Sequence, residues 1–205
     1  MSEEDLIIEV SKGLRDFAIN ASMKESGVIC ITGPNGSGKT TFLDIIAGLV
    51  RPEKGRIVVR GRDVTLLPPE KRGIALVTPE SYIPHLDVDT HIIKGARFRG
   101  IRYNPEIINK YKELLGVTFS GKVGSLSLGQ KERVAILTAI LSSPLLLLLD
   151  EAISNISDRE DFLKKLIEIV KNKGISMIYV TQDEDIASVA DHHYVMQNGS
   201  LMKRY

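Results

Sequence analysis

Short apolar runs alternate with segments of helical periodicity along most of the chain. Four of these runs predict buried strands, at residues 28–32, 74–78, 145–149 and 175–180. After the first run, apolar residues recur at intervals of three and four, as on the buried face of a helix. They are Phe42, Ile45, Ile46 and Leu49. Alternating strands and helices indicate an α/β fold with a mainly parallel sheet and helices on both faces.

Other parts of the chain add to this alternation. Further strands are predicted at 6–10, 17–19 and 56–60, and further helices at 131–141, 161–171 and 186–190. From Pro84 to about Leu115 the periodicity is helical, with scattered basic residues that we interpret as a solvated face. Near the end, Asn198-Gly199 predicts a two-residue hairpin turn.

A glycine-rich loop separates the strand at 28–32 from the helix that follows. The loop is Gly33, Pro34, Asn35, Gly36, Ser37, Gly38, Lys39, Thr40 and Thr41. It fits G-x-x-x-x-G-K-T, the Walker A pattern, in which glycines let successive backbone N–H groups converge on one anion. Lys39 can then reach the terminal phosphates and the Thr40 hydroxyl can bind Mg²⁺. The chain is therefore expected to bind a nucleoside triphosphate.

Two acidic residues close the apolar run at 145–149. A fully apolar strand is typical of the centre of a parallel sheet, and its carboxyl end faces the crevice where ligands bind. Asp150 is thus predicted to hold Mg²⁺, as a Walker B aspartate does. Glu151 is predicted to lie beside the γ-phosphate and to orient and deprotonate the attacking water.

Composition narrows the function classes. The 205 residues suit one domain, and a net charge of +1 gives no electrostatic footprint for nucleic acid. Residues 1–5 are acidic and lack the order of a signal peptide. The longest uncharged stretch, 134–149, is shorter than the ~20 residues of a membrane-spanning helix and contains Pro144. We expect the chain not to cross a membrane by itself.

The segment Leu126-Ser127-Leu128-Gly129-Gln130 precedes the predicted helix 131–141. It resembles the L-S-G-G-Q signature of ABC-type ATPases, with Leu128 in place of the first glycine. Ser127 and the Gly129 amide would lie at a helix N-terminus, ready to donate to phosphate oxygens. The resemblance implies that Ser127, Gly129 and Gln130 bind the ATP held by a second subunit. The active unit would be a head-to-tail dimer, either a homodimer or a heterodimer, that encloses two ATP molecules with Mg²⁺.

The resemblance covers nearly the whole chain and implies a fold and a role. The fold would be a P-loop NTPase with a RecA-like, mainly parallel sheet core, an N-terminal antiparallel β portion and an inserted α-helical subdomain. One ABC-type ATP-binding domain would span 1–205, with the core and β portion at 1–78 and 144–205 and the helical subdomain at about 79–143. The role would be ATP hydrolysis that powers a transporter by closing and reopening the dimer.

The implied partners are transmembrane transporter subunits, which would hold this minimal subunit in the cytoplasm at the inner face of the cell membrane. The segment 80–88 is where the family docks such partners. One alternative is a soluble ABC-type ATPase acting on DNA, chromosomes or ribosomes, although no long heptad insertion or tandem cassette is present. Another is a small-molecule kinase or a GTPase, although the guanine-reading N-K-x-D is absent. A slow, regulatory partner in a heterodimer is a fourth possibility.

Four positions depart from the family pattern. Gln182 stands where a switch histidine is expected, and it can bond the γ-phosphate or a water without carrying charge. Residues 78–80 (Thr-Pro-Glu) replace a glutamine that contacts Mg²⁺. No aromatic residue is evident for adenine stacking, since Phe17 is predicted to pack in the core. Residues 154–157 (Ser-Asn-Ile-Ser) replace the S-A-L-D that couples the two sites. With Lys39 and Glu151 present, we expect slow but measurable hydrolysis.

The four histidines predict no metal site. His192 and His193 are adjacent on a predicted strand and so point to opposite faces. His85 and His91 are expected to be solvated, and no cysteine accompanies them.

Overall fold

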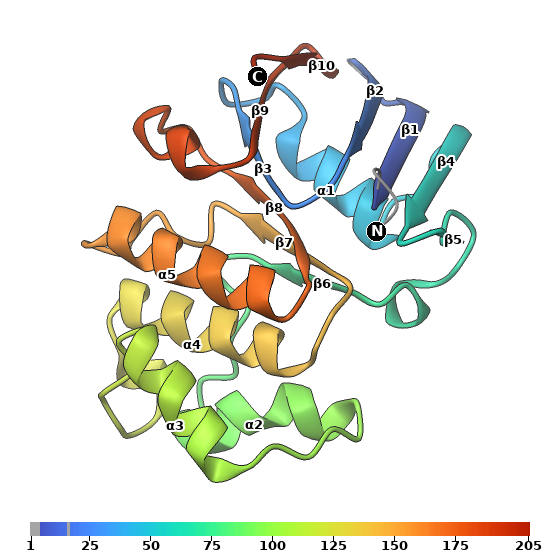
Figure 1. The fold of residues 1–205 in the computed structure, drawn as a ribbon. Coiled ribbons are helices and arrows are strands. Elements are labelled where there is room, and N and C mark those ends of the chain that lie inside the picture. The colour runs from blue at the N-terminus through green and yellow to red at the C-terminus, as the bar shows by residue number, and fades with distance from the viewer. Residues whose placement is uncertain (1–4, 16) are drawn as a thin grey trace.

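A computed structural model describes residues 5–15 and 17–205 (Figure 1). Most of the acidic segment 1–5 thus lies outside the described residues. The strands are β1 (Leu6–Gly13), β2 (Ala18–Glu25), β3 (Val28–Thr32), β4 (Lys54–Val59), β5 (Arg62–Asp63), β6 (Ile74–Val77), β7 (Leu146–Asp150), β8 (Ser176–Val180), β9 (His192–Gln197) and β10 (Ser200–Lys203). The α-helices are α1 (Lys39–Ala47), α2 (Val88–Phe98), α3 (Pro105–Leu114), α4 (Leu128–Leu141) and α5 (Arg159–Asn172).

The described strands form one curled sheet in the order β5-β4-β1-β2-β10-β9-β3-β8-β7-β6. Strands β9, β3, β8, β7 and β6 run parallel to one another. Strands β2, β1, β4 and β5 form an antiparallel part. A single parallel bridge from Ser200 in β10 to Asn20 in β2 joins the two parts. The predicted α/β fold and its N-terminal antiparallel β portion are confirmed.

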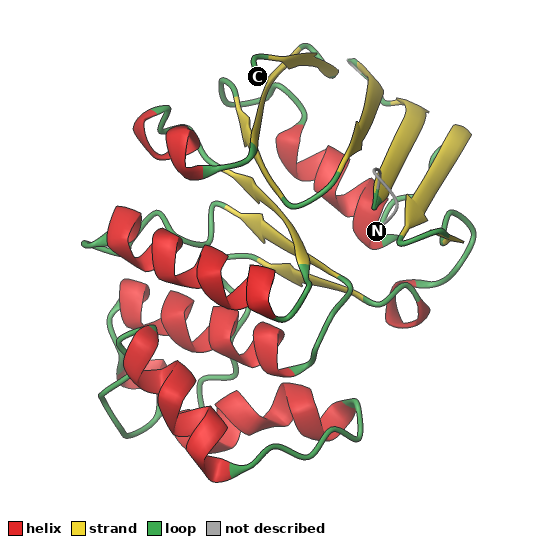
Figure 2. Cartoon of the chain, viewed as in Figure 1, coloured by secondary structure: helices red, strands yellow, loops and turns green. Residues whose placement is uncertain are grey.

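Burial on both faces explains the uninterrupted apolar strands. Along β7, Leu147 and Leu149 enter one core, and Leu146 and Leu148 enter the other. The first core lies against α4 and α5, and the second contains α1 and the inner face of the antiparallel part. Figure 2 shows α1 inside the curl of the sheet and the other α-helices gathered on the opposite side. A strand covered on both faces has no polar side to present, so its sequence does not alternate.

The segment between β6 and β7 carries α2, α3 and α4, which pack together as the helical part of the molecule. Among the described residues, no helix has the length and apolar character needed to cross a membrane.

Three sequence-based expectations about local structure are wrong. Leu49 is 62% exposed, because α1 ends when Gly48 adopts the left-handed conformation. The predicted helix 186–190 is a short 3₁₀ helix, Asp185–Val189. His91 is buried, where its Nε2 accepts a hydrogen bond from the Ile83 amide at 3.0 Å and its Nδ1 lies 2.9 Å from the Thr138 hydroxyl.

The predicted hairpin turn is confirmed. Asn198 and Gly199 both have positive φ, 47° and 75°, as the favoured two-residue turn between β9 and β10 requires.

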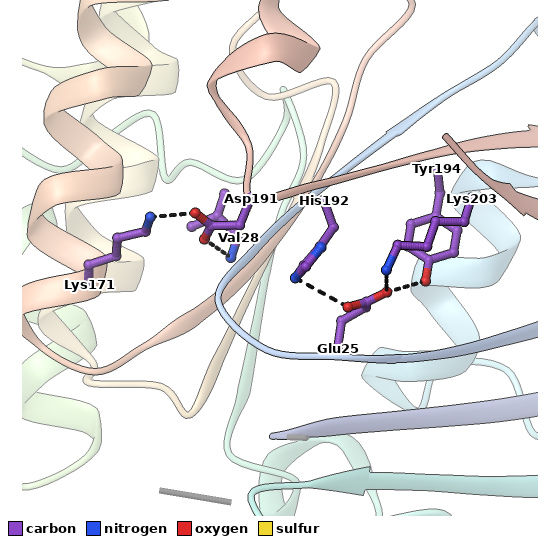
Figure 3. Close-up of polar contacts among 7 residues, drawn as sticks. All are labelled: Glu25, Val28, Lys171, Asp191, His192, Tyr194 and Lys203. Carbon is purple, nitrogen blue, oxygen red and sulfur yellow. Dashed lines mark hydrogen bonds and ion pairs between the residues drawn. The ribbon is translucent and has the colours of Figure 1, made fainter. Parts of the chain in front are cut away.

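A group of polar contacts fastens these last strands to the rest of the sheet (Figure 3). The buried Glu25 carboxylate accepts hydrogen bonds from the Tyr194 hydroxyl and Lys203 Nζ, both at 2.5 Å, and lies 3.2 Å from His192 Nε2. Beside it, Asp191 accepts from the Val28 amide. We call Glu25, His192, Tyr194 and Lys203 the Glu25 cluster. It ties the ends of β2 and β10 to the beginning of β9.

Candidate functional site

The loop 33–41 lies between the carboxyl end of β3 and the first turn of α1, as its sequence predicts. Gly33 has φ 146°, and a Cβ there would lie 2.2 Å from the Met196 carbonyl oxygen. Gly38 has φ 105° and precedes the first residue of α1. Any other residue would be strained at these two positions, because of the backbone approach or the left-handed φ. The loop therefore packs closely against β9 at Gly33 and against β2 at Gly38.

Lys39 is folded against this loop. Its side chain is buried, and Nζ donates to the carbonyl oxygens of Gly33 at 2.8 Å and Pro34 at 2.9 Å. Burial lowers the pKa of Lys39, while Glu151 and Asp150 act in the opposite direction. The buried Ser37 hydroxyl oxygen has no hydrogen-bond partner among the described residues. A polar cradle with an unpartnered buried hydroxyl is suited to an anionic ligand.

The two acidic residues lie at the same edge of the sheet. Since β3, β8 and β7 are adjacent and parallel, their carboxyl ends bring Asp150 and Glu151 next to the loop. Asp150 is 8% exposed, and burial raises its pKa, while the Thr40 hydroxyl and Lys39 favour its charged form. A buried carboxylate beside another acidic residue favours a cation.

Glu151 and Gln182 are joined directly. Gln182 Nε2 donates to Glu151 Oε1 at 2.9 Å, and the Glu151 amide donates to the Val180 carbonyl at 3.3 Å. Glu151 has φ 52°, an uncommon conformation for a residue with a side chain. A cavity of about 120 Å³ adjoins this pair, lined also by Ser154 and Arg159. Gln182 thus contacts Glu151, the residue predicted to deprotonate the attacking water.

The signature segment begins α4, in the helical part of the molecule and apart from the loop 33–41 (Figure 1). Ser127 and Gln130 form a reciprocal capping box: the Ser127 hydroxyl accepts from the Gln130 amide, and Gln130 Oε1 accepts from the Ser127 amide. Leu128 is 55% exposed. A Cβ on Gly129 would lie 2.4 Å from the Asn155 carbonyl oxygen, so close packing against the loop after β7 requires glycine here.

The expectation that Phe17 packs in the core is wrong. Phe17 is 36% exposed, because β2 begins one residue later, at Ala18. Its ring lies beside the phosphate loop, where Cε2 would be 3.1 Å from a Cβ on Gly38. Sequence reasoning missed this neighbour because the two residues lie far apart along the chain.

The segment 78–81 forms a turn near Asp150, and the charge of Glu80 contributes to raising the pKa of that carboxyl. The Ser81 hydroxyl accepts from the Thr78 amide at 2.9 Å, which closes a tight turn. Glu80 is exposed and lines a groove of about 550 Å³ together with Tyr82, Ile83 and Phe98. The groove lies between this segment and α2.

Comparisons with known proteins agree with this geometry. Residues 17–154 match the family model described as "ABC transporter". The chain is 38% identical to a molybdate/tungstate import ATP-binding protein of Pyrococcus abyssi, over 95% of this chain and 60% of that protein. It is 37% identical to a spermidine/putrescine import ATP-binding protein of Hahella chejuensis, over 90% of this chain and 53% of that protein. The chain thus spans little more than half the length of these two relatives.

A solved structure of a putative ABC transporter ATP-binding protein from Pyrococcus furiosus superposes with a TM-score of 0.81 at 28% identity. That match covers 93% of this chain and 96% of the other. The fold and the glycine-loop site define an ATP-binding cassette of the P-loop NTPase class. The chain belongs to the ABC transporter family.

Proposed function

We propose that this chain binds ATP in the loop 33–41 and hydrolyses it with Glu151 as the base, as the energising subunit of a transporter. The juxtaposition of Lys39, Asp150 and Glu151 at one edge of the sheet carries this proposal. The loop amides and Lys39 would hold the phosphates. Glu151 would accept the proton of the attacking water, and Gln182 would hold the Glu151 carboxylate in place.

Mg²⁺ is proposed to bind between the Thr40 hydroxyl and the Asp150 carboxylate. Both are oxygen ligands, and the buried Asp150 is the kind of acceptor that a divalent cation stabilises in its charged form. When bound, the ion would neutralise charge that develops on the phosphate oxygens.

We infer that a second ATP-binding subunit completes the site. Ser127, Gly129 and Gln130 lie at the beginning of α4 and apart from the loop 33–41 of their own chain (Figure 1). They would instead meet the ATP held by a second subunit in a head-to-tail dimer. The exposed Leu128 supports this inference, because an apolar residue on a free helix end is better covered by a partner.

The transmembrane partner is proposed to dock in the groove lined by Tyr82, Ile83 and Phe98. Phe98 is 85% exposed, and an apolar ring in an open groove suits a short helix of a membrane subunit. The relatives named as import subunits favour import, with the chain held at the cytoplasmic face of the membrane. We further propose that Phe17 contacts the adenine ring, since it stands exposed beside the phosphate loop.

Hydrolysis by the purified chain, compared with its Glu151→Gln variant, tests the proposal. The amide cannot accept the proton of water, so kcat should fall by at least about 100-fold while ATP still binds. A variant with wild-type kcat would rule out Glu151 as the base. A wild type that fails to bind ATP would rule out the nucleotide site itself.

A further inference from the structure

A buried acid lies under the signature segment. Glu132, in the second turn of α4, is 1% exposed, and such a carboxylate is costly unless donors meet it. Its Oε1 accepts from Asn155 Nδ2 at 2.6 Å, and its Oε2 accepts from the Asn155 backbone amide at 3.1 Å. Both contacts therefore come from one residue of the loop after β7. Burial raises the pKa of Glu132, while these hydrogen bonds lower it.

The same loop continues back to Glu151. Asn155 Nδ2 also donates to the Ser154 hydroxyl at 3.3 Å, and that hydroxyl donates to the Glu151 carbonyl at 2.8 Å. The Ser154 amide donates to the same carbonyl at 3.2 Å. Because Glu151 has a positive φ, its conformation depends on the contacts that hold the turn after it.

Two further contacts join this loop to α4. The Gly129 backbone lies against the Asn155 carbonyl, and Arg133 pairs with Asp158 at the far end of the loop. The beginning of α4 and the loop 152–156 therefore form one packed unit, with the Glu132 carboxylate buried at its centre.

We propose that Glu132 is a positioning residue for hydrolysis: through Asn155 and Ser154 it fixes the backbone of Glu151 to the signature helix. The inference rests on the proposed role of Glu151. Movement of α4 against a second subunit would then shift the base, so each hydrolysis site would sense whether its own signature segment is engaged.

Exchanging the acceptor and donor side chains of Glu132 and Asn155 tests the proposal. Glu132→Gln places an amide NH₂ against a donor, and Asn155→Asp places a carboxylate against a carboxylate. Either change should lower kcat about tenfold, with KM for ATP changed less than about twofold, because the base moves and the phosphate loop does not. In the double variant, the new amide on α4 can accept from the backbone N–H of position 155 and donate to the new carboxylate there. Most of the lost kcat should therefore return.

Amide hydrogen exchange of 152–156 in the nucleotide-free protein gives a readout that needs no hydrolysis. Exchange there should accelerate in both single variants and recover in the double variant. Glu168→Gln is the matched control, since Glu168 is exposed on α5 and should change neither readout. Single variants with wild-type kcat and exchange would overturn the proposal, as would a kcat loss that the double variant leaves uncorrected. If the wild type binds ATP but does not hydrolyse it, the proposed function fails, and the exchange data still decide whether Glu132 fixes the loop.

Discussion

The amino and carboxyl ends of the parallel strands differ in how their buried polar groups are compensated. At the amino ends, the Glu25 carboxylate is met by three donors (Figure 3). At the carboxyl ends, Asp150 is buried beside Glu151, and the Ser37 hydroxyl has no partner among the described residues. The first arrangement stabilises the fold by itself. The second leaves polar groups available for a ligand, and its cost is recovered only on binding.

The pKa directions follow this contrast. Burial raises the pKa of Glu25, but hydrogen bonds from Lys203 and Tyr194 and the charge of His192 together bring it below its ordinary 4.5. Asp150 has the opposite net result: burial and Glu151 leave its pKa above the ordinary 3.8. Ionised Glu25 thus favours the folded state, and ionised Asp150 opposes it.

The largest expected effect is on the carboxyl-end site. Lys39→Ala removes the side-chain cation that folds onto the loop, so ATP affinity should fall by at least about 100-fold. Fluorescent ATP titration measures this change. Unfolding in urea should be nearly unchanged, because the Lys39 ammonium bonds carbonyls of the loop and not the core. If the variant instead lost much of its free energy of unfolding and kept its affinity for ATP, Lys39 would serve the fold and not ligand binding.

The next effect is on the amino-end cluster. Glu25→Gln removes a buried charge from beside Lys203 and should lower the free energy of unfolding by about 2 kcal/mol near neutral pH, with kcat unchanged. In the wild type the contribution is complete above the ordinary pKa of 4.5 and is lost as pH falls through the lower folded value. Urea titrations across that range check it. Glu9→Gln is the control, since the Glu9 ion pairs are exposed and their loss should cost less than about 1 kcal/mol.

The third effect is kinetic. Gln182→Ala removes the hydrogen bond to Glu151 and should lower kcat about tenfold, whereas Gln182→His should raise it, because an imidazole can carry charge. Steady-state hydrolysis with both variants measures this. If neither variant changes kcat, Gln182 is not the switch residue.

The smallest effect has the opposite sign to that of Glu25. Asp150→Asn should stabilise the nucleotide-free protein by about 1 kcal/mol near neutral pH, because it removes a buried charge whose raised pKa opposes folding. In the wild type this penalty is absent below pH 3.8 and develops as pH rises through the folded pKa. The variant should lack that dependence. If the variant were less stable than the wild type, the burial of the Asp150 charge would already be offset by its protein neighbours, as it is for Glu25.

The sequence predicted the parts of the molecule in which neighbours along the chain are neighbours in space. The loop 33–41, the two acids at the end of β7 and the hairpin turn each depend on a contiguous motif. Gln182 was predicted as the switch residue because the resemblance points to the end of β8, and that role stays a prediction. The Glu25 cluster, by contrast, joins residues from β2, β9 and β10, which no local pattern connects.

The errors at His91 and Phe17, and the missed burial of Glu132, have the same origin. His91 was expected to be solvated, but its own helix, α2, packs against α4, which buries the ring and supplies the Thr138 hydroxyl as a partner. Phe17 was predicted to begin a strand and to pack in the core, yet β2 begins at Ala18 and the Phe17 ring lies beside Gly38. Glu132 follows the signature as an ordinary charged residue, and only the packing of α4 against the loop after β7 buries it.

The most direct test of the contrast is unfolding with and without Mg²⁺ and ATP in wild type, Lys39→Ala and Glu25→Gln. At a hundredfold excess of nucleotide over Kd, the wild type should gain about 2.7 kcal/mol. Glu25→Gln, although less stable, should gain the same amount, and Lys39→Ala should gain almost nothing. The account would be contradicted if nucleotide failed to stabilise the wild type, or if both variants lost the same amount of this stabilisation. Either result would mean that ligand binding at the carboxyl ends and fold stabilisation at the amino ends are not separate.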